Sequence, residues 1–285
     1  MAASMLAGAP TPSPTTQETD VPSQRTPAST LALLLTAALA LSACGDEQAA
    51  TTESGVPLVR AGTLVTCTHL PYEPFQFQDG GEIVGFDVDV VDAIAADLGV
   101  EQELVDTPFE TIQSGEDLNA GKCDLAAAGM TINDVREENL DFSDPYFEAT
   151  QALIAPAGSG YTSLDDLAGL SLGIQAGTTG AEYAQENAAD AELVTFEDLG
   201  LLLTAVQSGQ VDAAINDNSV LYDFAADNDD VEVTAEFDTG EAYGIGVKTD
   251  NAKLLEAVNA SLARIQEDGT YDEIYQEWFG TTPTS

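Results

Sequence analysis

Short apolar runs alternate with amphipathic stretches in the body of the chain, which begins near Leu58. The pattern predicts strands at 64–68, 101–105 and 124–129, and helices that end near 98 and that span 112–120. Strands that alternate with helices are typical of a parallel sheet covered by helices on its faces. The fold class predicted for this unit is therefore α/β.

The same alternation starts again after residue 148. It predicts strands at 149–155, 171–175, 193–196 and 211–216, with helices at 163–168, 181–188, 199–208 and 219–228. A strand at 243–247 and helices at 252–267 and 271–279 follow, and we expect these helices to pack on the first unit. Residues 121–126 and 209–214 are similar and play the same part in each unit. The chain is therefore expected to form two similar lobes.

The charge of the chain restricts its partners. Asp and Glu number 50 against 7 Lys and Arg, which gives a formal net charge of -43. Such a chain repels phosphate backbones, so we expect no nucleic acid among its partners. The acids are scattered along the sequence, as on a solvated surface, and the hydrophobic content of 44% is enough for a packed core.

The N-terminal residues carry the pattern of an export signal. An apolar run at 31–41 follows Arg25 and is too short to span a bilayer, so 1–43 are expected to be a signal peptide. Small residues before Cys44 resemble the bacterial lipobox, in which the cysteine is lipidated. The alternative is an ordinary cleaved signal peptide. Residues 44–57 are small and polar, which predicts a flexible tether.

Several motifs occur in order along the body of the chain. They are GFDVD at 85–89, Thr131 with Arg136 after it, FSDPY at 142–146, Asp217, and GTY at 269–271. Together they closely resemble family 3 of the bacterial extracellular solute-binding proteins, the polar amino-acid receptors of ABC importers. The resemblance covers residues 58–280.

The resemblance implies a two-lobed periplasmic-binding-protein-like fold of type II. Each lobe is expected to hold a mostly parallel sheet flanked by helices. The first lobe is assigned to 58–150 and 243–285, and the second to 151–242. Two hinge crossings, near 150–153 and 242–246, are expected to join the lobes and to let them close on a ligand.

The carboxylate of a free amino acid needs a fork of donors, which arginine provides. Arg136 follows a buried strand, at the sheet edge where α/β folds bind ligands, and Thr131 can add a hydroxyl and an N–H group. The turn that contains Thr178 and Thr179 opens a helix and offers a second anion seat. The alternatives are a surface ion pair for Arg136 and a simple helix cap for the turn.

The ammonium and the side chain of the ligand need other contacts. Asp217 matches the acid that binds the amine in the family, although a helix N-cap is the alternative. Gly129 matches the carbonyl that faces the amine. The resemblance assigns Tyr72 and Phe109 to the ligand's aliphatic stem.

Contacts with the ligand's side chain are expected from His69, Gln175 and Asn216. The family often has Asp at position 69 and Lys at position 175. The neutral residues found here favour a polar uncharged ligand such as glutamine or cystine over lysine or arginine, with glutamate kept in the candidate set.

The function expected is capture of an amino acid outside the cytoplasm and delivery to an ABC permease, by a monomer anchored to the membrane through lipid on Cys44. We expect no catalytic residue, no metal and no cofactor; His69 is the single histidine. Two alternatives stay open. One is a secreted cyclohexadienyl or arogenate dehydratase on the same scaffold, and the other is a ligand-sensing module.

Two cysteines remain once Cys44 is assigned to the lipid. Cys67 lies in the first strand and Cys123 adjoins the strand at 124–129, and these strands should be neighbours in a doubly wound sheet. An even pair in an exported domain favours a disulfide. The alternative is two buried free thiols.

Overall fold

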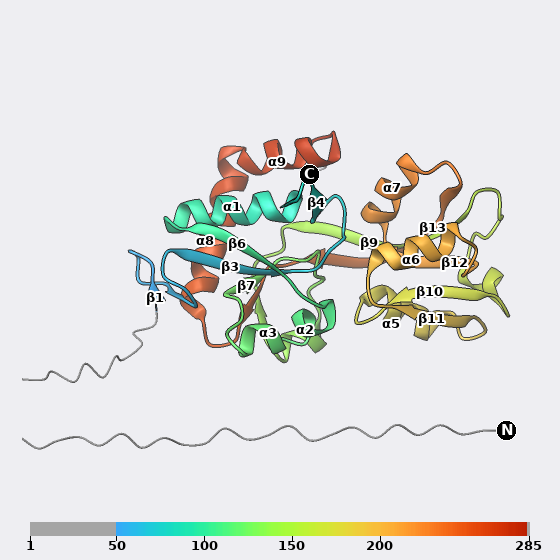
Figure 1. The fold of residues 1–285 in the computed structure, drawn as a ribbon, viewed down its shortest axis with the longest axis horizontal. Coiled ribbons are helices and arrows are strands. Elements are labelled where there is room, and N and C mark those ends of the chain that lie inside the picture. Colours follow the sequence, from blue (N-terminus) through green and yellow to red (C-terminus); the bar gives the residue numbers. More distant parts are fainter. Residues whose placement is uncertain (1–49, 284–285) are drawn as a thin grey trace, which may run out of the picture. The chain divides into compact units, whose positions relative to one another are not determined.

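The computed structural model describes residues 50–283, which fold into two α/β lobes (Figure 1). The expected signal peptide and Cys44 lie outside the described residues. No helix within residues 50–283 combines the length and the apolar character that crossing a bilayer requires.

The first lobe is built on a five-stranded mixed sheet. Its order is β6 (Glu101–Asp106), β3 (Thr63–Thr68), β7 (Leu125–Ala126), β14 (Gly246–Lys248) and β8 (Leu140–Phe142). β3 runs parallel to β6 and β7, whereas β14 is antiparallel to β7 and β8. Four of the five strands therefore run in one direction, as the prediction of a mostly parallel sheet required, and only the returning C-terminal strand β14 runs against them.

The second lobe repeats this plan. Its sheet has the order β11 (Glu192–Phe196), β10 (Ser171–Gln175), β12 (Ala213–Asp217), β9 (Phe147–Pro156) and β13 (Val231–Tyr243). β10 is parallel to β11 and β12, and β9 is antiparallel to β12 and β13. The prediction of two similar α/β lobes is confirmed.

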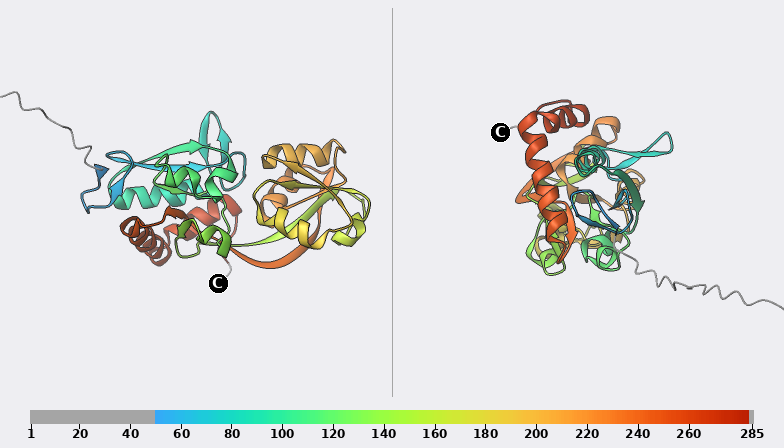
Figure 2. Two further views of the ribbon diagram at one scale, coloured as in Figure 1. Left: turned by 90° about the horizontal axis from the view of Figure 1, so that it is seen from below. Right: turned by 90° about the vertical axis from the view of Figure 1, so that its left-hand side faces the viewer.

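Strand β13 was missed by the sequence analysis upstream of residue 243. Its apolar residues alternate with polar ones, at Val231, Val233, Ala235 and Phe237, which is the period of a half-buried strand. β9 and β13 lie side by side and run between the lobes (Figures 1 and 2).

Helices cover both sheets. In the first lobe they are α1 (Phe86–Leu98), α2 (Phe109–Gln113), α3 (Glu116–Asn119), α4 (Asp134–Glu137), α8 (Ala252–Asp268) and α9 (Thr270–Phe279). The second lobe has the 3-10 turn Leu164–Leu167, α5 (Thr179–Asn187), α6 (Leu199–Gln207) and α7 (Asn218–Asp227). Helices α8 and α9 contact α1, as expected. The single helix expected at 112–120 is divided at Gly115, whose φ of +75° interrupts it.

Two short hairpins complete the described chain. β4 (Phe77–Asp79) pairs with β5 (Glu82–Val84), and β1 (Ala50–Thr51) pairs with β2 (Pro57–Leu58). Val56 and Leu58 are buried in the main hydrophobic cluster. The structured body therefore begins before residue 58 and includes the C-terminal part of the expected tether.

Aromatic side chains pack where β9 and β13 leave the first lobe. Phe147 and Tyr243 stack with ring centroids 5.4 Å apart, and Phe75 meets them edge-on at 4.9 and 5.2 Å. Gly85 has φ +140°, and a Cβ there would lie 2.1 Å from the carbonyl oxygen of Phe75. Only glycine therefore permits this approach. The cluster fixes the inner end of both linking strands.

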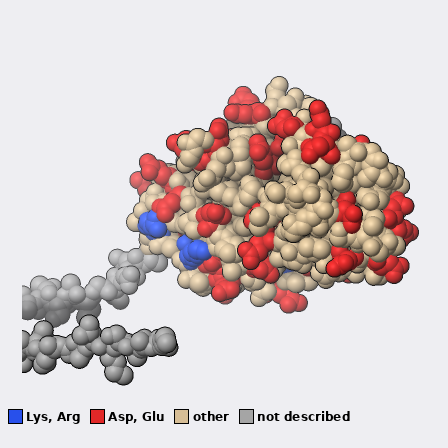
Figure 3. Space-filling view, turned by 45° about the vertical axis from the view of Figure 1, so that its right-hand side comes forward, with Lys and Arg blue, Asp and Glu red and all other residues tan. Residues whose placement is uncertain are grey.

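The surface is strongly acidic. Acidic side chains are spread over the face shown in Figure 3, and few basic ones interrupt them. This distribution agrees with the scattered acids of the sequence.

The predicted disulfide is confirmed. Cys67 and Cys123 are bonded, with their Cα atoms 5.6 Å apart. The strands are neighbours as expected, because Cys67 in β3 pairs with Ala126 in β7. The bond joins two segments that contribute to the site. One is 67–76, which begins at Cys67, and the other is the strand β7, which leads to Gly129.

Removing this bond by Cys67→Ser with Cys123→Ser is expected to lower the free energy of unfolding by up to about 4 kcal/mol, because the bond closes a loop with a sequence separation of 56. Urea titration with and without reductant measures the loss. The double variant is the control, since reductant should not change its stability. Labelling of both thiols by an alkylating agent in the folded, unreduced wild type would contradict the bond.

Candidate ligand-binding site

A small cavity lies between the lobes, at the ends of strands from both sheets. Its volume is about 20 Å³, roughly enough for one water molecule. The sequence-predicted residues that line it are His69, Tyr72, Phe109, Gly129, Thr131, Arg136, Gln175, Thr178, Thr179 and Asp217. Gln76 and Ala128 also line it and were not predicted. Asn216 is the one predicted contact residue that does not line the cavity.

Arg136 is held at the cavity by the short helix that contains it. Asn133 caps α4, and its Oδ1 accepts a hydrogen bond from Arg136 N at 2.9 Å. The guanidinium donates from Nη1 to Thr131 O at 2.6 Å and from Nη2 to Gly177 O at 3.1 Å. Arg136 is 3% exposed and pairs with no acid within the described chain. A surface ion pair is therefore excluded for this residue.

The Arg136 guanidinium contacts both lobes, since Thr131 belongs to the first and Gly177 to the second. Its Cζ lies 5.3 Å from the centroid of the Phe109 ring, a cation–π contact. Burial lowers the pKa of Arg136, and the negative charge of Asp217 opposes this shift. A planar, charged fork in this position can bind a carboxylate through two parallel hydrogen bonds.

The N-terminus of α5 supplies the second anion seat. Thr178 is its N-cap: the side-chain oxygen accepts from Ala181 N at 3.1 Å and donates to Gln175 O at 2.8 Å. The helix cap considered from the sequence is therefore present. Thr178 and Thr179 also line the cavity, so the free N–H groups of the first helical turn can face an anion.

The Asp217 carboxylate is buried at the end of β12. Its Oδ2 accepts hydrogen bonds from Tyr72 Oη at 2.6 Å and from Tyr243 Oη, and its Oδ1 accepts from Gln151 Nε2. Asp217 occupies the N-cap position of α7, but its side chain makes no capping hydrogen bond. The capping role that the sequence left open is therefore excluded for the side chain.

Burial is the main cause of the shifted pKa of Asp217. It raises the pKa of Asp217 to about 6, with the charge of Glu241 as the next cause, while hydrogen bonds from the two tyrosines act in the opposite direction. Burial also raises the pKa of Tyr72 and Tyr243 well above 10, so both phenols stay protonated and donate. At neutral pH, Asp217 is thus a charged acceptor suited to an ammonium group.

Gly129 is positioned by a buried acid that the sequence analysis did not name as functional. Asp87 accepts from Gly129 N at 2.8 Å and from Tyr146 Oη at 2.7 Å. Burial raises the pKa of Asp87 to about 6. Gly129 has φ +53°, and a Cβ there would lie 2.7 Å from Cε1 of Tyr72. The first acid of the GFDVD motif therefore supports the cavity from behind.

Glu241 is a second functional candidate that the sequence analysis missed. Its Oε2 accepts from Thr131 Oγ1 at 2.7 Å and from Thr179 Oγ1 at 2.6 Å, and its Oε1 accepts from Gln151 Nε2 at 3.1 Å. One carboxylate on β13 thus joins a residue from each lobe. Its position next to a predicted hinge crossing was the only signal in the sequence.

Residues 64–281 match the family described as bacterial extracellular solute-binding proteins, family 3. The chain belongs to this family. The glutamine-binding protein GlnH of a Bacillus subtilis ABC transporter is 38% identical over 208 residues, which are 71% of this chain and 75% of the relative. The resemblance noted from the motifs is thus confirmed.

Solved structures of similar proteins agree with the family. An ancestral arginine-binding protein bound to glutamine is 40% identical, with a TM-score of 0.73 over 78% of this chain and 99% of that one. An ancestral amino acid-binding protein, a precursor of cyclohexadienyl dehydratase, is 35% identical, with a TM-score of 0.70 over 76% of this chain and 95% of that one. The type II fold of family 3 is therefore shown.

Arg136→Ala in this family 3 protein is expected to weaken amino-acid binding by about 2–5 kcal/mol, or roughly 30-fold to 5,000-fold in Kd, because a buried charged fork is lost. Arg136→Lys should recover little, since an ammonium cannot copy the fork. Isothermal titration calorimetry measures both. Arg60→Ala is the control, because Arg60 pairs with Glu103 at the surface. Unchanged affinity in Arg136→Ala would refute the assignment of Arg136 to the carboxylate of the ligand.

Affinity for an amino acid is expected to fall as the pH drops below about 6, the pKa of Asp217, because the carboxylate must lose its proton before it can pair with an ammonium. The fall approaches roughly tenfold in Kd per pH unit. Calorimetry between pH 4.5 and 8 measures it.

Asp217→Asn should bind more weakly and lose this pH dependence. Asp87→Asn is the matched control, because burial also raises the pKa of Asp87 to about 6. The contradicting outcome is that the pH dependence of Kd is unchanged in Asp217→Asn and lost in Asp87→Asn. It would show that Asp87, and not Asp217, is the acid whose protonation weakens binding.

Proposed function

We propose that this solute-binding protein captures a polar amino acid by closing its two lobes and delivers it to an ABC permease. The observation that carries the proposal is that Arg136 from the first lobe and Asp217 from the second face one cavity. These two charges match the carboxylate and the ammonium of an amino acid. Thr131, Thr178 and Thr179 complete the carboxylate side of the site, and Gly129 the ammonium side.

Lobe movement is required by the size of the cavity. Its volume of about 20 Å³ is far below the 300 Å³ or more that is typical of sites for small molecules. Contacts across the cavity, from Arg136 to Gly177 and from Tyr72 to Asp217, must therefore open to admit a ligand. Closure of the two lobes around the ligand, with β9 and β13 as the hinge, then removes the ligand from water.

The ligand is a polar, uncharged amino acid in this proposal, of the glutamine or cystine kind. His69 and Gln175 line the cavity at positions where the family often has Asp and Lys, so a charged ligand side chain would lack the counter-charge that those two residues provide. Support comes from the relatives: GlnH is named for glutamine, and the ancestral arginine-binding protein was solved with glutamine. The side-chain carboxylate of glutamate would lack a cationic partner, because Arg136, the only Lys or Arg in the lining, is assigned to the ligand's α-carboxylate.

The proposed location of the protein in the cell rests on the N-terminal sequence. The apolar run at 31–41 and the lipobox-like residues before Cys44 support export and a lipid anchor on the outer side of the cell membrane. We place the protein there as a monomer that meets its permease by diffusion within the membrane plane.

A thermal-shift screen of the twenty amino acids and cystine tests the proposal. A ligand at 100 times its Kd should add roughly 2.7 kcal/mol to the stability of the full chain. Small-angle scattering should show compaction with the same ligand, and Arg136→Ala should show neither effect.

The competing outcome is catalysis. Formation of product from prephenate or arogenate would favour a dehydratase, the activity for which one similar ancestral protein is described as a precursor. Absence of both stabilisation and compaction with every amino acid would contradict capture.

A further inference from the structure

The cavity is also lined by uncharged polar side chains whose hydrogen-bonding direction is fixed, directly or through one neighbour, by the backbone. A backbone carbonyl can only accept and a backbone N–H can only donate. Each such group that touches a side chain therefore determines which end of that side chain is left to meet a ligand. Three lining residues, His69, Gln76 and Gln175, can be oriented in this way.

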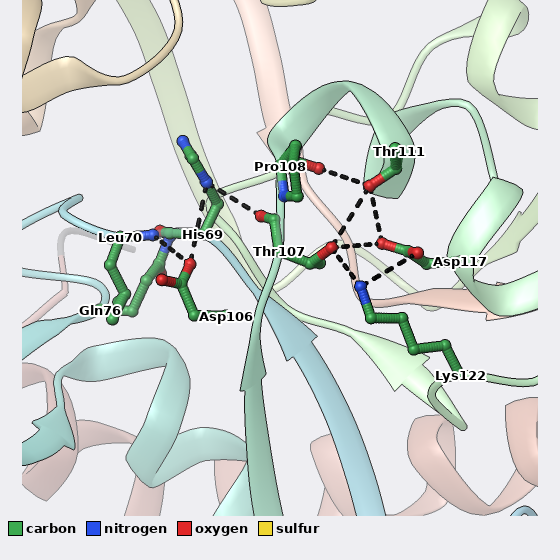
Figure 4. A network of polar contacts seen from close by, with 9 residues as sticks. All are labelled: His69, Leu70, Gln76, Asp106, Thr107, Pro108, Thr111, Asp117 and Lys122. Carbon is green, nitrogen blue, oxygen red and sulfur yellow. Dashed lines mark hydrogen bonds and ion pairs between the residues drawn. The ribbon is translucent and has the colours of Figure 1, made fainter. Parts of the chain in front are cut away.

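His69 presents an acceptor to the cavity. Its Nδ1 lies 2.9 Å from Thr107 O, so Nδ1 carries the hydrogen, and Asp106 Oδ1 at 3.9 Å favours the same arrangement. Figure 4 shows this nitrogen facing Thr107 and Asp106 while the other ring nitrogen points away from both. In the neutral ring that second nitrogen, Nε2, is an acceptor. It is buried and has no hydrogen-bond partner among residues 50–283.

Gln76 presents a second acceptor. Its amide nitrogen Nε2 lies 3.4 Å from the carbonyl oxygen of His69, which fixes the orientation of the amide. The opposite end, Oε1, is buried and has no partner in the described part of the chain. Gln76 is 1% exposed and lines the cavity, so this oxygen is a buried acceptor available to a ligand.

Gln175 presents a donor. Asp217 N donates to Asn216 Oδ1 at 2.8 Å, which leaves Asn216 Nδ2 as the end that donates to Gln175 Oε1 at 3.1 Å. The amide nitrogen of Gln175, with its two hydrogens, is then the end left for a ligand. Asn216 therefore acts through Gln175, although it does not line the cavity.

From these three orientations we infer that the ligand carries a side-chain carboxamide, as glutamine and asparagine do. Its NH₂ group supplies two donors for His69 Nε2 and Gln76 Oε1, and its carbonyl accepts from Gln175 Nε2. Glutamate has no donor at neutral pH and would place a carboxylate against two acceptors. Arginine has donors only and would leave the Gln175 amide opposed to another donor.

This inference rests on the proposed function and adds Gln76 as a residue that determines specificity. A buried polar group left without a partner weakens binding strongly, and sites built for such a group reject analogues by orders of magnitude. We therefore expect the wild-type full chain to bind glutamine or asparagine at least roughly 100-fold more tightly than glutamate or arginine.

Calorimetry with glutamine, asparagine, glutamate, arginine and cystine tests this order. An affinity for arginine, glutamate or cystine that lies within roughly 100-fold of the affinity for the better carboxamide, or exceeds it, would overturn the inference and leave amino-acid capture intact. Binding of none of the five, with no response in the wider amino-acid screen, would overturn both.

Two substitutions test the assigned polarities. Gln76→Glu puts a negative charge opposite the ligand's donors and should move the arginine-to-glutamine affinity ratio at least tenfold toward arginine. Gln175→Lys should move the glutamate-to-glutamine ratio at least tenfold toward glutamate. Gln276→Glu and Gln276→Lys are the controls, because Gln276 is exposed on α9.

Ratios between ligands are insensitive to a general loss of stability, so they separate specificity from folding. Unchanged ratios in both folded variants would refute the roles of Gln76 and Gln175. If a variant does not fold, as judged by circular dichroism, the selectivity of the wild type still decides the inference.

Discussion

The carboxylate of Asp217 is buried where the two lobes meet, and it accepts hydrogen bonds from Tyr72, Tyr243 and Gln151. A buried charge is tolerated only when it is paired or well hydrogen-bonded. Tyr72 comes from the first lobe, whereas Tyr243 and Gln151 lie on the linking strands. The same charge that suits an ammonium group is thus satisfied only when all three parts of the molecule come together, and we expect it to couple ligand binding to lobe closure.

A comparable arrangement exists on the carboxylate side. Arg136 reaches Gly177 of the second lobe, and Glu241 accepts from Thr131 and Thr179 on opposite sides of the cavity. These contacts use the groups that a ligand's carboxylate would use. Opening therefore exchanges interactions within the protein for water, and closing on a ligand exchanges water for the ligand. The net gain can be modest, which suits a protein that must later release its cargo.

Three interactions hold the scaffold behind the site in place. The disulfide between Cys67 and Cys123 joins the strands that lead to His69 and Gly129, and stacked Phe147 and Tyr243 hold the inner ends of the linking strands. Asp87 fixes the backbone of Gly129. We therefore expect lobe movement to bend β9 and β13, with each half of the cavity moving as a unit.

The sequence by itself determined the α/β class and the two similar lobes, because periodicity is a local property of the chain. The cysteine pair followed from the strand order that this class implies, and most of the residues that line the cavity followed from the motifs that the chain shares with family 3. The tertiary structure decided the rest. Strand direction at β14 depends on where the returning chain enters the sheet, and the role of Glu241 depends on two lobes meeting. The orientation of Gln76 depends on the loop that brings its amide to the carbonyl of His69. Such relations depend on the positions of atoms in space rather than on the pattern of residues along the chain, so they become visible only when the fold places the atoms together.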